Sequence, residues 1–416
     1  MPGSRSVFRS LHTRNYRLFF LGQTSSQIGT WAQSIALAWL VLDLSGNDGV
    51  AVGVLTALIA LPTLILGTLG GVAADRFDNR KLLLGAQVVL AIVSTVLAIL
   101  VITDVVELWM VYVLALAGGF AQVIDNPTRQ SFLSEMVTPA ELPNAVGLNS
   151  AIAQSARIVG PAIAGLLIVA VGTGICFAID AVSFLAVIAA LLMMRPAELH
   201  PRPRAARARG QVREGLRYTW ASPELRNALL IAAVLGTFAL NWGVVFPLLA
   251  KRTFGSDAAE FGLMTTVMSV GALTGALTVA RLGLRSARAV VLGGYAMGAC
   301  TVVASLMPQL WLFLVVLVPL GFSMIVHMVS TNAFLQLHAA PTMRGRVMAL
   351  YAITIFGLLP IGGPLMGWLS DTTSPRVAFA FAGCTSLVSC TAFGLRLMRG
   401  ERREGTAAPS RDAASG

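Results

Sequence analysis

Long apolar runs, separated by short polar segments, follow one another along almost the whole chain. A helix needs about 20 apolar residues to cross the hydrocarbon core of a bilayer. The runs are continuous rather than alternating in short segments, so they favour an all-α membrane protein over a membrane barrel. We predict twelve transmembrane helices, at approximately residues 17–42, 50–74, 81–102, 108–133, 145–170, 173–194, 226–250, 259–280, 287–307, 309–337, 347–370 and 375–397.

The basic residues indicate an orientation. If the N-terminus is cytoplasmic, Lys251, Arg252 and Arg376 fall in outer loops and Arg157 falls inside a span, whereas the other 26 of the 30 Lys and Arg residues lie on the cytoplasmic side. Cytoplasmic loops are enriched in Lys and Arg, so we expect both termini in the cytoplasm. The excess of Arg over Lys, 28 to 2, indicates a GC-rich bacterial genome, so the membrane we expect is the bacterial cytoplasmic (inner) membrane.

Composition agrees with this placement, since 56% of the residues are apolar and only 12% are charged. The net charge of +11 follows from the cytoplasmic loops and from attraction to anionic membrane lipid, so we infer no nucleic-acid partner.

An Arg- and Pro-rich stretch divides the predicted helices into two groups of six. We expect a six-helix bundle over residues 1–194, a cytoplasmic linker over 195–224, a second six-helix bundle over 225–400 and a disordered cytoplasmic tail over 401–416. Offsets of 202 to 205 residues align the two groups at matching positions, which pair Gly70 with Gly275, Arg76 with Arg281, Arg80 with Arg285, Gly119 with Gly321, Pro139 with Pro341, and Gly160-Pro161 with Gly363-Pro364. Two parallel repeats are typical of secondary transporters, which bind substrate between the halves.

One short turn carries five charges between two apolar runs, in the stretch GGVAADRFDNRK. Its pattern of Gly71, Asp75, Arg76, Arg80 and Lys81 resembles the loop 2–3 signature of the major facilitator superfamily. Other stretches resemble the twelve-span drug and siderophore exporter branch of that superfamily, which includes enterobactin and macrolide exporters: NYRLFFLGQTSSQIGTWAQSIALAWLVLDLSG, DNPTRQSFLSEMV, LNSAIAQSARIVGPAIAGLLI and RGRVMALYAITIFGLLPIGGPLMGWLSD. The resemblance covers about residues 8–400 and implies the major facilitator fold.

The charged turn is interpreted as a gating latch. Gly71 would allow a close helix approach, and Asp75 at a helix end could sit against the positive N-terminus of another helix, which is worth roughly 0.3–1 kcal/mol. In the superfamily that helix is span eleven, and Arg80 or Arg76 could then pair with Asp125 while the cytoplasmic side is closed. The alternative is a plain topology loop, in which the basic residues only hold the turn inside.

Span five contains Gly160, Pro161 and Gly165, which resemble the antiporter motif that the superfamily associates with export. Proline bends a helix, and small residues around it let another helix pack closely. The alternative is a packing kink without any bearing on direction.

Charges inside the bilayer are costly and usually face a cavity or a partner. Asp125, Arg157 and Asp180 are the charged residues that we place firmly inside spans, with Asp125 close to the inner edge. In the superfamily spans one, four, seven and ten line the substrate cavity, and the candidates on spans one, seven and ten are Gln23, Gln27, Trp31, Phe238, Asn241, Trp242, Thr331 and Asn332. For each polar candidate, an ordinary interhelical hydrogen bond is the alternative.

Proton coupling needs a group that binds and releases a proton during the transport cycle. The candidates are Asp180, Asp125 and His327, with Arg157 as a basic residue that could neutralise Asp125. Asp180 lies on span six, which is peripheral in this fold, so a role in helix packing is the alternative.

We therefore expect a secondary active transporter that exports an amphipathic small molecule, a drug or siderophore-like metabolite, by proton antiport with alternating access. The alternative is a proton-coupled importer of the same fold. HExxH, GxSxG and Walker-type motifs are absent, and the histidines and cysteines lack metal-like spacing, so we expect no enzyme, no cofactor and no metal. The expected partners are a small-molecule substrate, protons and membrane lipid, and the expected state is a monomer.

Overall fold

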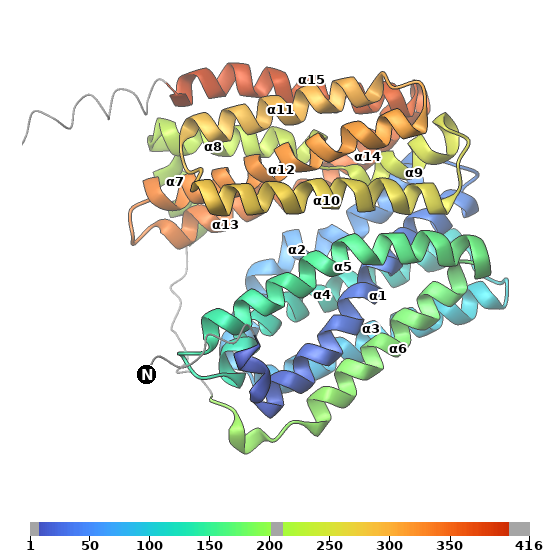
Figure 1. Cartoon of the computed structure of the whole chain (residues 1–416), viewed down its shortest axis with the longest axis vertical. Coiled ribbons are helices and arrows are strands. Elements are labelled where there is room, and N and C mark those ends of the chain that lie inside the picture. The colour runs from blue at the N-terminus through green and yellow to red at the C-terminus, as the bar shows by residue number, and fades with distance from the viewer. Residues whose placement is uncertain (1–7, 201–210, 399–416) are drawn as a thin grey trace, which may run out of the picture. The chain divides into compact units, whose positions relative to one another are not determined.

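The computed structural model describes residues 8–200 and 211–398. The predicted tail over 401–416 lies outside these residues, as does part of the predicted linker. The first half of the chain forms six long helices: α1 (Arg14–Leu44), α2 (Gly49–Arg76), α3 (Asn79–Ile102), α4 (Leu108–Met136), α5 (Leu142–Val171) and α6 (Thr173–Met193), as Figure 1 shows. Short 3₁₀ turns precede and follow them, at Arg9–His12 and Pro196–Glu198.

The second half is less regular. It contains α7 (Gln211–Ala221), α8 (Pro223–Val234), α9 (Trp242–Leu248), α10 (Ala258–Leu282), α11 (Ala287–Ser305), α12 (Leu310–His338), α13 (Arg344–Phe356), α14 (Leu359–Thr372) and α15 (Pro375–Ser389). Three π-helical turns occur at Leu235–Ala239, Leu249–Thr253 and Cys390–Gly394. Spans seven and eleven are therefore each broken, although the sequence predicts a single run for both.

Aspartate caps explain two helix starts. Asp48 accepts hydrogen bonds from the N–H groups of Val50 (2.7 Å) and Ala51 (3.2 Å) at the start of α2. Asp78 accepts one from the N–H of Lys81 (3.1 Å) at the start of α3. A side-chain acceptor at this position satisfies an N–H group that has no partner within the helix. One charge of the crowded turn, that of Asp78, therefore serves to begin a helix.

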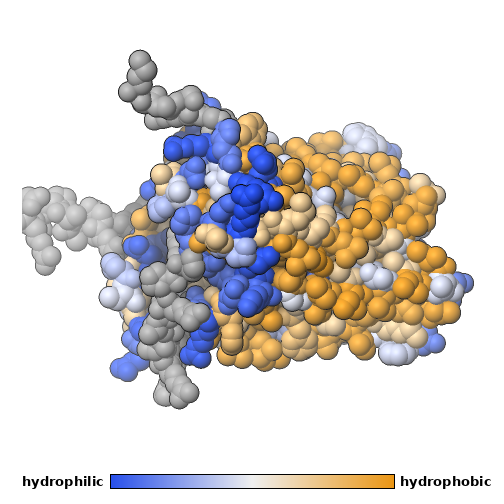
Figure 2. All heavy atoms as spheres, turned by 90° about the horizontal axis from the view of Figure 1, so that it is seen from below, coloured by the Kyte–Doolittle hydropathy of each residue, from blue (hydrophilic) through white to orange (hydrophobic). Residues whose placement is uncertain are grey.

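Eleven helical segments in the described residues are long and apolar enough to cross a membrane. The predicted first span, α1, is long enough at 31 residues but is not among them, because a row of Gln, Ser and Thr residues lowers its hydropathy. It packs along α5 and α6, which are both among the eleven. Apolar residues cover much of the face seen in Figure 2, as expected for a surface in contact with lipid.

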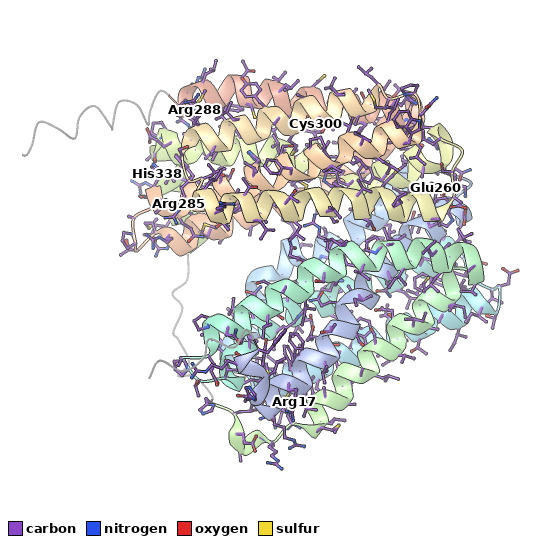
Figure 3. All side chains as sticks on the ribbon, in the orientation of Figure 1. Arg17, Glu260, Arg285, Arg288, Cys300 and His338 are labelled. Carbon is purple, nitrogen blue, oxygen red and sulfur yellow. The ribbon has the colours of Figure 1, made fainter. Side chains whose placement is uncertain are left out.

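The chain forms two compact units. The first consists of Met1–Arg207 and Phe246–Thr266, and the second of Ala208–Val245 and Val267–Gly416. The end of span seven and the start of α10 thus belong to the first unit, although we assigned both to the second bundle. Within the second unit, Arg285, Arg288 and His338 lie at the same end of the helices, the end expected to be cytoplasmic (Figure 3).

Repeat-related glycines make equivalent contacts in the two units. A Cβ atom on Gly70 of α2 would lie 2.0 Å from the carbonyl oxygen of Val123 on α4. A Cβ atom on Gly275 of α10 would lie 2.6 Å from the carbonyl oxygen of Phe322 on α12. Both distances are too short for any side chain, so each unit brings its second and fourth spans together through a glycine.

The predicted linker over 195–224 is partly helical, because it contains α7. This helix packs against α13: Glu214 forms an ion pair with Arg346 (2.6 Å), and the Tyr218 hydroxyl accepts a hydrogen bond from the N–H of Ala340 (3.0 Å). The linker residues from 211 to 221 are thus held on the second unit.

Candidate functional site

Asp180 lies at the centre of a buried polar cluster in the first unit. Its side chain on α6 is completely buried, and its Oδ2 atom accepts a hydrogen bond from the Ser94 hydroxyl on α3 (2.9 Å). Ser94 in turn accepts one from the amide of Gln33 on α1 (2.8 Å). Ser183 contacts Oδ1 at 3.4 Å. In the described part of the chain, no basic side chain forms an ion pair with Asp180.

Gly29 brings α1 directly against this carboxyl group. A Cβ atom on Gly29 would lie 2.5 Å from Asp180 Oδ1 and 2.7 Å from the Ser183 hydroxyl oxygen. Asp180 is therefore enclosed by three helices, and a change in its charge acts on the packing of all three. Sequence analysis found Asp180 but not Ser94, Gln33 or Gly29, whose proximity depends on how the helices pack.

Asp125 lies in a second polar cluster, on α4. It forms an ion pair with Arg129, one helical turn later, and its Oδ1 atom accepts a hydrogen bond from the Gln87 amide on α3 (2.7 Å). Arg129 also reaches Gln23 Oε1 on α1 (3.4 Å) and Asn126 Oδ1 (2.9 Å). Sequence analysis missed Arg129, although its spacing of four residues from Asp125 is the usual one for helical ion pairs.

The partners proposed for Asp125 have other contacts in this structure. Arg80 donates hydrogen bonds to the carbonyl oxygens of Leu191 (2.8 Å) and Leu192 (3.3 Å), near the C-terminus of α6. Arg157 places its guanidinium carbon 5.6 Å from the ring centroid of Trp31, the distance of a cation–π contact. The expected pairs of Asp125 with Arg80 or Arg157 are therefore not formed here, and Arg76 is exposed. Asp75 is partly buried, and the latch role of Gly71 and Asp75 stays a prediction.

The span-five glycines are points of close helix contact within the first unit. A Cβ atom on Gly160 would lie 2.6 Å from Trp31 Cβ on α1, and one on Gly165 would lie 2.7 Å from the Ala258 carbonyl oxygen at the start of α10. A Cβ atom on Gly262 would lie 2.3 Å from the Pro161 carbonyl oxygen. These contacts show how tightly α5 packs, and the association of the motif with export stays a prediction.

An unexpected group of side chains joins α1 to the segment 246–266. Lys251 forms an ion pair with Asp43, and its ammonium nitrogen lies 5.0 Å from the ring centroid of Trp39. Trp39 in turn stacks on Phe261 of α10, with ring centroids 6.4 Å apart. We call these four residues the 43–251 clamp. Sequence analysis placed Lys251 in an outer loop without a partner, since the two charges lie about half the chain apart.

α10 begins with a reciprocal cap next to this clamp. The Asp257 carboxylate accepts a hydrogen bond from the N–H of Ala259 (2.7 Å), and the Glu260 carboxylate accepts one from the N–H of Asp257 (3.1 Å). Hydrogen bonding with the Glu260 side chain and with the N–H groups of Ala259 and Glu260 lowers the pKa of Asp257.

In the second unit, His327 lies in a helix interface. Its Nδ1 atom is 2.9 Å from the carbonyl oxygen of Val290 on α11, and a Cβ atom on Gly294 would lie only 3.3 Å from it. The Thr331 hydroxyl donates to the His327 carbonyl oxygen (2.7 Å), and Asn332 Oδ1 accepts from Gln336 (2.6 Å). His327 therefore makes a contact expected of a residue that packs helices, whereas the hydrogen bonds of Thr331 and Asn332 lie within α12.

The remaining candidates differ in their surroundings. Phe238 and Trp242 pack edge to face on Phe381 and Phe379 of α15, at centroid distances of 5.5 and 5.6 Å. The Asn241 amide nitrogen donates to the Thr237 carbonyl oxygen (2.6 Å), but its Oδ1 atom has no hydrogen-bond partner in the described residues. Gln27 is partly buried on α1. No cluster of three or more potential metal ligands occurs among residues 8–200 and 211–398.

Repeated membrane helices that carry buried charged side chains are typical of membrane transporters. The family model described as "Transmembrane secretion effector" (MFS_3) matches residues 5–411, and the chain belongs to this family.

Relatives cover most of the chain at low identity. The chain is 28% identical over 386 residues to the multidrug efflux pump Tap of Mycobacterium tuberculosis (strain ATCC 25618 / H37Rv). This alignment covers 88% of this chain and 91% of Tap. It is 22% identical over 388 residues to macrolide efflux protein A of Streptococcus pyogenes, with 91% and 95% covered. It is 26% identical over 376 residues to the uncharacterized MFS-type transporter YfiS of Bacillus subtilis (strain 168), with 87% and 88% covered.

Solved structures support the fold. A bacterial homolog of the human lysosomal transporter Spinster superposes with a TM-score of 0.70 at 14% identity and 95% coverage of both chains. A POT family transporter in complex with a thioalcohol-conjugated peptide gives a TM-score of 0.74 at 11% identity, with 91% of this chain and 95% of that chain covered.

Proposed function

We propose that this protein exports an amphipathic small molecule across the bacterial cytoplasmic membrane in exchange for protons. The similarity to efflux pumps over nearly the whole chain supports the direction of transport. The observation that carries the proton coupling is Asp180, a completely buried carboxyl group held between α1, α3 and α6 by hydroxyl groups rather than by a basic partner.

A carboxyl group can couple protons to conformation through its burial. The negative form is costly to bury inside a membrane bundle, whereas the neutral form costs much less. Binding and release of a proton at Asp180 therefore change the relative free energies of two packings of α1, α3 and α6. A ligand or proton shifts a conformational equilibrium only through such a difference.

The charged turn has a separate role in this proposal. The state that is closed on the cytoplasmic side would be stabilised by Gly71, Asp75, Arg76 and Arg80. In this state the arginines of the turn would compete with Arg129 for Asp125 on α4, which is now paired with Arg129. The amide and aromatic candidates on spans one, seven and ten would contact substrate.

The test is transport by purified protein in liposomes, under an imposed pH gradient of either direction. The panel contains ethidium, a macrolide and a siderophore, and a pH-sensitive dye reports proton movement. Asp180→Asn is the test variant. Asp104→Asn is the matched control, because Asp104 is exposed in a turn at φ 58°, a conformation that Asn also adopts readily.

We expect a panel member to move against the direction of proton flow in the wild type and in Asp104→Asn, and the proton movement linked to it to be lost in Asp180→Asn. Substrate and protons moving in the same direction would instead indicate an importer. Unchanged proton movement in Asp180→Asn would remove Asp180 from the mechanism.

A further inference from the structure

Two broken spans meet inside the second unit. Span seven is interrupted by the π-helical turn Leu235–Ala239 and by a non-helical step at 240–241, before α9 begins. Span eleven is interrupted by a turn at 357–358, between α13 and α14. The repeat-related spans of the first unit, α1 and α5, are single helices, so the breaks do not simply follow from the repeat.

Glycines hold the two breaks in contact. A Cβ atom on Gly236 would lie 2.1 Å from the carbonyl oxygen of Thr354, and one on Gly362 would lie 1.8 Å from the carbonyl oxygen of Thr237. Neither distance leaves room for a side chain. A bilayer tolerates broken helices only where the backbone is buried in protein or lines a cavity, and transporters use such breaks to bind substrates and ions.

Asn241 adds an unused hydrogen-bond acceptor at this contact. Its side chain is only 3% exposed, and its amide nitrogen donates to Thr237 and would lie 2.8 Å from a Cβ atom on Gly362. Its Oδ1 atom has no partner among the residues that the structure describes. A buried polar atom without a partner is costly, so a hydrogen-bond donor placed here would stabilise the site.

We propose that the paired breaks of spans seven and eleven form a subsite that binds the N–H group of an ammonium substrate with an aromatic body, with Asn241 Oδ1 as the acceptor. Phe238 and Trp242 flank Asn241 on the same span and supply the aromatic surroundings that suit such a body. This inference rests on the proposed function and names the substrate class.

The test uses two probes with different hydrogen-bond donors: a naphthylethylammonium ion and its bulkier N-trimethyl analogue. Both carry the same ring system and charge, but only the first has N–H groups. Binding is measured as thermal stabilisation of the purified protein, and transport is measured in liposomes. Asn241→Leu removes the acceptor. Asn227→Leu is the matched control, because Asn227 lies on α8 of the same span and is also 3% exposed.

We expect the wild type and Asn227→Leu to bind the N–H probe about tenfold more tightly than the trimethyl probe, the size of one hydrogen bond to a buried acceptor. Asn241→Leu should bind both equally, at the affinity of the trimethyl probe. If Asn241→Leu does not fold, Asn241→Ala makes the same comparison with a smaller side chain.

A preference that survives in the Asn241 variants would overturn the subsite, as would equal loss of both probes or no binding of the N–H probe by the wild type. The two proposals fail in different ways. Binding with the expected preference but without proton-linked transport removes the export proposal and keeps the subsite. Proton-linked transport without an Asn241-dependent preference keeps the export proposal and removes the subsite.

Discussion

Removal of the Lys251 ammonium should loosen the segment 246–266 from α1. The side chains of Lys251 and Asp43 are 28% and 46% exposed, so their ion pair is worth about 0.2–1 kcal/mol, as for surface pairs. The cation–π contact with Trp39 adds about 0.5–1 kcal/mol at a partly exposed site. Together these amount to about 0.7–2 kcal/mol, and a loss of this size raises the open population roughly three- to thirtyfold, since 1.4 kcal/mol is a factor of ten.

Ala250 provides a reporter for this opening, because it is completely buried next to Lys251. In a background without the native cysteines, Ala250→Cys should react with a membrane-impermeant maleimide only when the segment separates from α1. When opening is fast relative to labelling, the rate follows the open population. We expect Lys251→Met, which keeps most of the aliphatic chain, to increase the rate roughly three- to thirtyfold.

The control is Lys251→Arg, which keeps a charge for both Asp43 and Trp39 and should label at nearly the wild-type rate. Adding Asp43→Asn to Lys251→Met should have little further effect, because the ion pair is already lost. A labelling rate in Lys251→Met within twofold of the wild type would refute the reasoning.

Three further predictions concern the first unit. Gly70→Ala should lower the melting temperature, because overpacking costs about 1–3 kcal/mol. Gly85→Ala should not lower it, since no atom outside its own helix lies within 4 Å of the added Cβ. Thermal unfolding in detergent compares the two variants. Arg129→Met should destabilise the protein by about 3–5 kcal/mol by leaving the buried Asp125 unpaired, and adding Asp125→Asn should restore part of the loss in the same assay. Ser94→Ala should weaken substrate-linked proton movement while Ser94→Thr preserves it, as followed with the pH-sensitive dye.

Apolar run length predicted most of the fold, because each span must be long enough to cross the bilayer. It could not predict the breaks in spans seven and eleven. The run around Asn241 is as apolar as a continuous helix requires, and the residues that contact the break, Thr354 and Gly362, lie far away in the sequence. Gly357 and Pro360 were visible signals for span eleven, since glycine and proline both weaken a helix interior.

The charged candidates were found more readily than their partners. Asp180 stood out because an acid inside an apolar run is rare, but Ser94 and Gln33 are unremarkable in sequence. For Asp125 the partner is local, because Arg129 lies one helical turn away, whereas the sequence pattern pointed to an arginine on another helix. Sequence therefore locates an intramembrane charge well and its hydrogen-bonded surroundings poorly.

The membership of residues 246–266 in the first unit has a consequence for biosynthesis. The chain passes between the units after residues 207, 245 and 266, and the last two crossings fall inside α9 and α10. A ribosome delivers the chain from its N-terminus, so the first unit stays incomplete until residue 266 has been made. Residues 208–245 of the second unit must therefore be synthesised before the first unit can finish folding.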